Sequence, residues 1–380
     1  MSLIHDLSLS RKPLAGFVAI GLAWSAYFAQ MPVIKAGVDA SDGAYGVAVL
    51  WASFGAIAAM WLAPLAHARL GGAAVALSIC VIALSILGTG LVGTLWALAL
   101  MLLLLSAGSG VVDVLINAQV AQAEESSGRA LMNLNHGLYS LSYAASAVGV
   151  GALREAGWAP PQIFALLLVL FAALGWASLG RTAAPDDVTP EAKTPLPTAL
   201  IWIAGTVVFF GFLIEAASEG WSALHLERGL GGSAQQGALG PALLGLMMGV
   251  GRLSGHALAR FVPELVLMSA ACLLTAVGLI AAALAPTVGV ALAGFATAGL
   301  GVSVIAPLTL AIAGRSAPAH IRLVVIARVS VLGYGAFFMG PPLMGLIAQG
   351  YSLSTAFLTV AVLSVGVGIG VVPLLARVAR

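Results

Sequence analysis

The sequence predicts an all-α polytopic membrane protein with twelve transmembrane helices in two six-helix pseudo-symmetric halves. Three observations support this class. Of 380 residues, 61% are hydrophobic and only 8% are charged, whereas about 25% are charged in soluble domains. Apolar runs long enough to cross a bilayer recur along the whole chain. One polar segment divides these runs into two sets of six.

Each predicted span is an apolar stretch of roughly 20 residues bounded by turn-forming or charged residues. The first half contains spans at residues 14–34, 43–66, 73–93, 95–121, 131–152 and 162–180. The second half contains spans at residues 198–218, 237–258, 265–285, 288–314, 323–347 and 354–376. The breaks at Gly93 and Pro286 are the slightest of these boundaries.

The segment 182–197 is rich in Pro and charge and has no apolar periodicity, so we expect a flexible cytoplasmic linker. It separates an N-terminal six-helix bundle, residues 1–181, from a C-terminal six-helix bundle, residues 198–380. A Gly-x-Gly pair at 108–110 has a counterpart at 299–301, in the corresponding span of the other half. The two halves therefore indicate an internal repeat.

Loop charges orient the chain in the membrane. With the N-terminus in the cytoplasm, 13 of the 16 Lys and Arg residues lie in inner loops or at inner helix ends. Only Lys35, Arg154 and Arg228 lie outside. We therefore predict a multi-pass protein of the inner (plasma) membrane with both termini in the cytoplasm.

A single acid, Asp113, interrupts the apolar span 95–121. A carboxylate in a membrane helix costs roughly 2.5 to 3.5 kcal/mol on insertion scales, and such residues usually face protein or a water-filled path. Asn117 lies one turn further along the same face. We expect Asp113 to be a proton-coupling group, because burial favours a neutral carboxyl and hydration favours proton release. The alternative is a structural acid that is neutral or hydrogen-bonded to a neighbouring helix.

Other polar and charged residues in the spans define a candidate site. Glu215, near the outer end of its span, is a second candidate for proton coupling. Neutral hydrogen-bonding or aromatic side chains are the candidates for substrate binding: Gln30, Asn117, Asn135, His136, Tyr139 and Tyr334. Such groups suit a small neutral polar solute such as a sugar. Arg252 and Arg328 alone among the basic residues lie clearly within spans, which disfavours a multiply anionic substrate.

The sequence carries no pattern typical of an enzyme. No His, Cys and carboxylate cluster has metal-ligand spacing, and neither Gly-x-Ser-x-Gly nor His-Glu-x-x-His occurs. We therefore expect no catalytic residue, cofactor or metal. Basic residues are scattered singly, so we expect no nucleic-acid partner. The expected partners are a small-molecule solute, protons and the lipid bilayer, with the protein functional as a monomer.

Twelve spans in two halves joined by a cytoplasmic linker resemble the major facilitator superfamily. That family's loop between spans 2 and 3, Gly-x-x-x-Asp-Arg-x-Gly-Arg, is similar to residues 64–72, PLAHARLGG, in which Arg69 and Gly71 match. Pro, Ala and Gly replace the first Gly, the Asp and the final Arg. Arg252 belongs to a looser copy in the second half.

Four segments resemble the fucose-permease-like branch of sugar:proton symporters: residues 113–117, 134–137, 215–222 and 333–342. The resemblance implies alternating access by rocking of the two halves, with bending at Gly/Pro-rich helices such as the one containing residues 340–342. It also implies that Asp113 takes part in proton-coupled uptake. Because spans 4 and 11 approach each other in this superfamily, we predict a gate formed by Asp113 and Arg328. The alternative is that Arg328 snorkels to the cytoplasmic interface.

Other functions remain open. The first alternative is an exporter of amphipathic compounds or drugs, with apolar and aromatic residues lining its cavity. The second, from a different class, is a membrane sensor or assembly protein that transports nothing. A channel is disfavoured because the two halves provide no obvious continuous pore.

Overall fold

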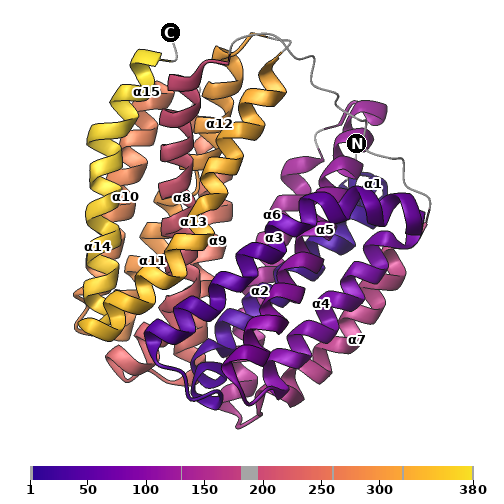
Figure 1. Ribbon diagram of the computed structural model, residues 1–380, viewed down its shortest axis with the longest axis vertical. Helices are drawn as coiled ribbons and strands as arrows, with labels where there is room; N and C mark the ends of the chain where they lie inside the picture. The colour runs from indigo at the N-terminus through magenta and orange to yellow at the C-terminus, as the bar shows by residue number, and fades with distance from the viewer. Residues whose placement is uncertain (1–2, 130, 181–195, 259–260, 319–320, 379–380) are drawn as a thin grey trace. The chain divides into compact units, whose positions relative to one another are not determined.

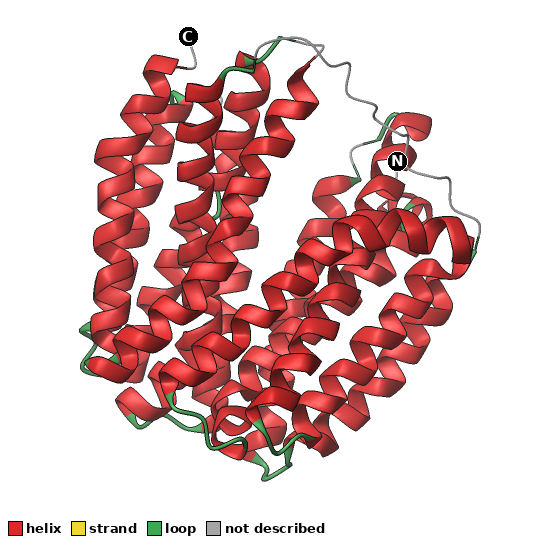
Figure 2. Ribbon diagram, viewed as in Figure 1, coloured by secondary structure: helices red, strands yellow, loops and turns green. Residues whose placement is uncertain are grey.

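The computed structural model describes residues 3–129, 131–180, 196–258, 261–318 and 321–378. Within that part of the chain, every regular element is a helix (Figure 2). The chain forms two compact units: Met1–Asp186 with Ser233–Ala242, and Asp187–Gly232 with Leu243–Arg380. Most of the predicted linker, residues 182–195, lies outside the described residues. The predicted domain boundaries therefore remain predictions.

The helices follow the order of the predicted spans (Figure 1). The first half contains α1 (Leu3–Leu9), α2 (Arg11–Gly37), α3 (Asp42–Leu70), η1 (Gly71–Ala73), α4 (Ala74–Leu91), α5 (Leu95–Ser127), α6 (Met132–Glu155) and α7 (Pro160–Ser178). The second half contains α8 (Thr198–Leu224), η2 (His225–Gly229), α9 (Ala234–Leu258), α10 (Glu264–Ala283), α11 (Val288–Val302), α12 (Ile305–Ser316), α13 (Arg322–Gly350), α14 (Leu353–Gly366), η4 (Val367–Val371) and α15 (Val372–Val378).

Helix length and composition agree with twelve membrane crossings. Among the described residues, ten helical stretches are long and apolar enough to span a bilayer. One of them, Asp42–Leu91, contains both α3 and α4, so the ten stretches account for eleven predicted spans. The remaining span is α6, in which Asn135, His136 and Tyr139 lower the hydropathy. The predicted all-α fold with twelve transmembrane helices is confirmed.

The two slightest breaks in the sequence are true helix boundaries. The Thr94 side chain accepts a hydrogen bond from the backbone N–H of Ala97 and caps α5. Thr287 does the same for Val290 and caps α11. A threonine oxygen at this position satisfies one of the amide donors that an α-helix leaves unpaired at its start. The fourth and tenth spans therefore begin in the same way, which agrees with an internal repeat.

Glycines pack these two helices against corresponding neighbours. In the first half, Gly108 of α5 lies against Ile82 of α4, and Gly110 lies against α3. In the second half, Gly301 of α11 lies against Thr275 of α10, and Gly299 lies against α9. A Cβ atom would collide with the neighbouring helix at Gly110, Gly299 and Gly301 and would be crowded at Gly108, so glycine allows the backbones to approach.

Two local features differ from the predicted spans. The tenth span is interrupted between α11 and α12, at Ser303 and Val304. The seventh span is longer than predicted, because α8 continues to Leu224 and into a π-helical turn, η2. By contrast, α13 runs through Pro341 and Pro342 as one helix. Hydropathy does not register these features, because they depend on local hydrogen bonding.

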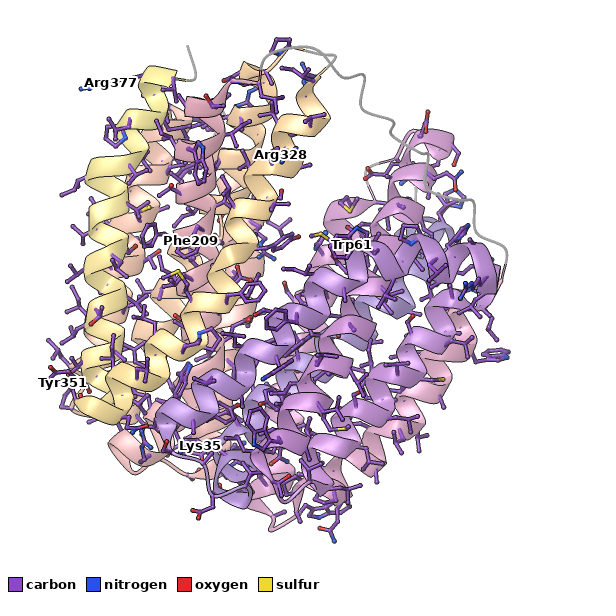
Figure 3. The ribbon with its side chains drawn as sticks, viewed as in Figure 1. Lys35, Trp61, Phe209, Arg328, Tyr351 and Arg377 are labelled. Atoms are coloured by element: carbon purple, nitrogen blue, oxygen red, sulfur yellow. The ribbon has the colours of Figure 1, made fainter. Side chains whose placement is uncertain are left out.

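A buried ion pair holds the turn between α2 and α3. Lys35 Nζ lies 2.9 Å from Asp42 Oδ1, and the two side chains are 11% and 7% exposed. The same ammonium donates to the Ala40 carbonyl at 2.6 Å. Further from this turn, the hydroxyls of Tyr27 and Tyr45 lie 2.6 Å apart. Figure 3 shows Lys35 at the end of the first unit that lies opposite α1.

Ionic and capping contacts organise the opposite end of the first unit. The Asp6 carboxylate of α1 pairs with the Arg129 guanidinium in the turn between α5 and α6, with Nη2 to Oδ2 at 2.8 Å. This hydrogen-bonded guanidinium holds the pKa of Asp6 below its ordinary value. Glu124 Oε1 accepts from the backbone N–H groups of Leu131 and Met132 and so caps α6.

Candidate functional site

Asp113 lies in α5 with its side chain exposed. Asn117 Nδ2 donates to its carboxylate Oδ1 at 2.9 Å and to its backbone carbonyl at 2.8 Å. The two residues therefore share a helical face, as their spacing predicts. No described Lys or Arg of the first unit forms an ion pair with this carboxylate. Among the described residues of the first unit, the hydrogen bonds of this membrane acid thus come from its own helix.

The neighbours of α5 explain why Asp113 is open. Gly16 of α2 packs against Val112 and Ile116, and Ala59 of α3 packs against Gly110. On a helix of 3.6 residues per turn, position 113 falls between these two contacted sides. Neither α2 nor α3 therefore covers the carboxylate.

Polar and aromatic groups of α2 and α6 extend this region of the first unit. Trp24 Nε1 donates to Ser109 Oγ at 3.2 Å, one helical turn before Asp113. On α6, His136 is half-buried and meets the Phe17 ring edge-on, with centroids 4.8 Å apart. Tyr139 is also half-buried, and its ring lies 6.1 Å from that of Tyr143. His136 and Tyr139, two of the candidate substrate-binding residues of α6, thus retain partly accessible surface.

Two other candidates for substrate binding are fully buried. Gln30 is 0% exposed, and neither its amide nitrogen nor its amide oxygen has a hydrogen-bond partner among the described residues. Asn135 is 0% exposed and donates to the Leu131 carbonyl at 2.8 Å in the first turn of α6. Neither side chain reaches a surface in this arrangement, so their contact with a solute remains a prediction.

In the second unit, the structure joins two residues that the sequence treats separately. Arg252 of α9 lies 3.7 Å from the carboxylate of Glu215 in α8. The side chains are 33% and 24% exposed, so the pair is only partly screened by solvent. This carboxylate therefore differs from Asp113 in having a cationic partner.

An aromatic stack lies one turn from Glu215. Phe212 of α8 stacks on Tyr334 of α13, with ring centroids 5.6 Å apart and an interplanar angle of 12°. Phe337 of the same helix also lies 5.6 Å from Phe212 and 6.1 Å from Tyr334, so the three rings form one cluster. All three rings are half-buried. Tyr334 therefore contributes to an aromatic surface that could contact a planar or ring-shaped solute.

The remaining predicted residues lie at helix ends or on the surface. Arg328 is exposed and lies near the end of the second unit at which α13 begins (Figure 3). Since it belongs to a different unit from Asp113, the predicted gate remains a prediction. Arg69 is exposed in the last turn of α3. Gly71 ends that helix with a φ of +52°, a conformation that favours glycine.

Sequence reasoning missed two contacts of this region. Nothing in the hydropathy pattern joins Trp24 to Ser109, because the contact depends on how α2 crosses α5. The stacking of Phe212 on Tyr334 likewise depends on the packing of α8 against α13. The sequence signal that could have identified Phe212 is its position one helical turn before Glu215, a membrane acid.

Among the described residues, no group of three or more His, Cys, Asp and Glu side chains could hold a metal.

Sequence relatives assign the chain to a known family. An uncharacterized MFS-type transporter of Yersinia pestis is 32% identical over 358 residues, which cover 92% of this chain and 91% of that protein. The chain belongs to the major facilitator superfamily. Membrane protein MosC of Rhizobium meliloti is 27% identical over 359 residues, covering 92% of this chain and 86% of that protein. No family profile matches the sequence.

Solved structures share the fold of this MFS transporter. The nucleoside transporter NupG superposes with a TM-score of 0.74 at 15% identity, covering 98% of this chain and 99% of that one. A D-xylose-proton symporter gives 0.67 at 14% identity, covering 97% and 98%. A bacterial homolog of the human lysosomal transporter Spinster gives 0.71 at 14% identity, covering 100% and 96%. These similarities show the fold, and the protein is a multi-pass membrane transporter of a small molecule rather than an enzyme.

Proposed function

We propose that this MFS transporter imports a small, neutral, sugar-like solute together with protons by alternating access. The observation that carries the proposal is the exposed carboxylate of Asp113 within a membrane-spanning helix. An apolar environment favours the neutral form of a carboxyl group, and a hydrated one favours its release of a proton. A carboxylate that is hydrogen-bonded only within its own helix can respond to both environments. It is therefore suited to carry a proton across a conformational change.

The solute class follows from the accessible candidate side chains of each unit. In the first unit these are the amide of Asn117, the imidazole of His136 and the phenol of Tyr139, all partly accessible. In the second unit Tyr334 and Phe212 present stacked ring faces. Neutral hydrogen-bonding groups on an aromatic and apolar lining are typical of sites for uncharged polar ligands.

Two further lines support a sugar-like solute. Segments around Asp113, His136, Glu215 and Tyr334 resemble the fucose-permease-like branch. A D-xylose-proton symporter and a nucleoside transporter share the fold. We propose the inner membrane as the location and the cytoplasm as the side of both termini, because the distribution of Lys and Arg follows the positive-inside rule.

The first test identifies the solute by thermal shift. Purified protein is heated with neutral sugars, small carboxylates or lipophilic cations, since a ligand of the folded state raises the unfolding midpoint by mass action. We expect one class of neutral sugars to raise the midpoint. That sugar is then added to proteoliposomes containing a pH-sensitive dye. Acidification of the interior on sugar addition supports proton-coupled import, and sugar entry without acidification contradicts it.

A second candidate function is export of amphipathic compounds. It is favoured by the aromatic side chains on α8 and α13, where Phe209, Phe210 and Phe212 precede Glu215 and Phe337 joins the stack. Such a surface suits an apolar ligand as well as a sugar ring. A midpoint raised only by lipophilic compounds, together with their proton-driven expulsion from the liposome, would establish this function in place of the first.

A further inference from the structure

The core-facing side of α8 carries polar residues where apolar ones are the rule. Gly211 on this side packs against Ile305 of α12, and the next positions on the same face follow at intervals of three or four residues. They hold Glu215, Ser218, Ser222 and His225. Both serines are fully buried, and the histidine is 2% exposed. We call these four residues the α8 polar stripe.

The two serine hydroxyls of the stripe have no hydrogen-bond partner among the described residues. Hydroxyls within helices ordinarily bond to a carbonyl three or four residues back. The buried hydroxyls of Thr275 and Thr309 in the same unit do so, at 2.8 and 2.6 Å. Ser218 and Ser222 do not use this acceptor. Because an unsatisfied buried hydroxyl is destabilising, its position in a core needs an explanation such as an ordered water or ion.

His225 ends the stripe with an acceptor that lacks a donor. Its Nε2 lies 3.0 Å from the Ala282 carbonyl of α10. A carbonyl can only accept, so Nε2 carries the hydrogen and Nδ1 of the neutral ring is an acceptor. Nδ1 has no partner among the described residues. The rings of Phe295 and Phe357 meet the imidazole edge-on.

Few titratable groups face the imidazole from the helices packed around it. The helices that supply Phe295 and Phe357, α11 and α14, contain none. On α10 the titratable residues are Cys272 and Glu264, which lie about 15 Å or more along the helix from Ala282. On its own element, Glu227 and Arg228 follow it in the π-helical turn.

We propose that the α8 polar stripe is a hydrated path that carries protons between Glu215 and the π-helical turn beginning at His225. Residues three or four apart place their Cβ atoms about 5–6 Å apart, a gap that one bridging water fits. Serine hydroxyls and water both donate and accept hydrogen bonds, so a proton can pass along such a chain. The proton-carrying role rests on the proposed proton-coupled transport, whereas the hydration of the stripe does not.

The hydration of the α8 polar stripe can be tested without any solute. The test is whether serine-to-alanine changes raise or lower the unfolding midpoint. In a dry core, Ser218→Ala or Ser222→Ala removes an unsatisfied hydroxyl, and the unfolding midpoint should rise. In a hydrated path, the same changes remove a partner of bound water, and we expect the midpoint to fall by about 2 °C or more. Ser303→Ala is the matched control, because that buried hydroxyl bonds to the Leu300 carbonyl. A rise for both stripe variants would overturn the proposal.

Proton carriage is tested with the solute found by the thermal screen. The double variant Ser218→Ala with Ser222→Ala should slow solute-driven proton uptake into proteoliposomes at least 10-fold and leave solute exchange near the wild-type rate. Wild-type proton uptake by this variant would contradict the path. If the unaltered protein moves solute without protons, the proposed function and the proton role of the stripe both fail. The stability change would still decide whether the stripe is hydrated.

Discussion

The two units treat their membrane acids in opposite ways. In the first unit, the ion pair between Lys35 and Asp42 lies at the turn between two helices. Asp113, near the middle of α5, is exposed and has no such partner among the described residues of this unit. In the second unit, Glu215 within α8 has the guanidinium of Arg252 as its partner. The contrast suggests that a cationic partner restricts proton exchange at Glu215, whereas the open Asp113 exchanges protons without this constraint. Asp113 is therefore the better candidate for the proton carrier.

The largest expected effect on stability comes from Lys35→Met. The change removes the ammonium that faces the buried Asp42 carboxylate, and breaking a buried pair on one side is strongly destabilising. We expect the free energy of unfolding, measured by denaturant titration in detergent, to fall by about 3 kcal/mol. Lys35→Arg, which keeps the charge, should lose clearly less. Equal losses for both variants would show that packing, not charge, holds this turn.

Arg252→Met should have an intermediate effect. Glu215 would keep its charge without its partner, but both side chains are a quarter to a third exposed. We expect a loss of about 1–2 kcal/mol, between the values for surface and buried pairs. Adding Glu215→Gln should restore most of it. A double variant that is as unstable as Arg252→Met would show that the two side chains do not act as a pair.

Asp113→Asn should hardly change stability. The carboxylate is exposed, and its side-chain hydrogen bond comes from Asn117 on the same helix. We expect a change of less than about 0.5 kcal/mol in the free energy of unfolding, similar to that of Glu125→Gln at the end of α5. A loss as large as that of Arg252→Met would mean that Asp113 is structural and would remove the contrast between the units.

The smallest expected effect on stability is that of Asp6→Asn, and it depends on pH. Arg129 holds the pKa of Asp6 below its ordinary value of 3.8. A depressed pKa in the folded state stabilises the protein above the unfolded pKa, and this contribution is lost as the pH falls through the folded value. Asp6→Asn should therefore be slightly less stable than wild type at pH 7. The difference should shrink as the pH falls below 3.8 and vanish once the folded-state carboxyl is protonated, and a difference that stays unchanged over this range would exclude this ion pair as its source.

Most of the fold could be predicted because bilayer thickness fixes the length of an apolar helix. Even the slight breaks before Thr94 and Thr287 are real, and both threonines are recognisable N-caps. The interruption at Ser303 could not be predicted in this way. An apolar run has the same hydropathy whether its helix is continuous or broken, so this feature required the backbone itself.

The contacts of the candidate site could be predicted from the sequence only where both residues lie on the same helix. Asp113 and Asn117 are four residues apart, so their hydrogen bond follows from helical geometry alone. The pairing of Glu215 with Arg252 depends on the arrangement of two helices, and no periodicity encodes it. The unsatisfied hydroxyls of Ser218 and Ser222 depend on side-chain direction, which composition does not reveal.

We propose that Asp113 couples the proton to the solute. The most direct measurement compares two activities of Asp113→Asn in proteoliposomes, with Glu125→Gln as control. One is accumulation of the solute driven by a pH gradient, and the other is exchange of labelled for unlabelled solute without a gradient. We predict that accumulation is abolished while exchange remains partly active. Accumulation at the wild-type level, or equal loss of both activities, would contradict the claim.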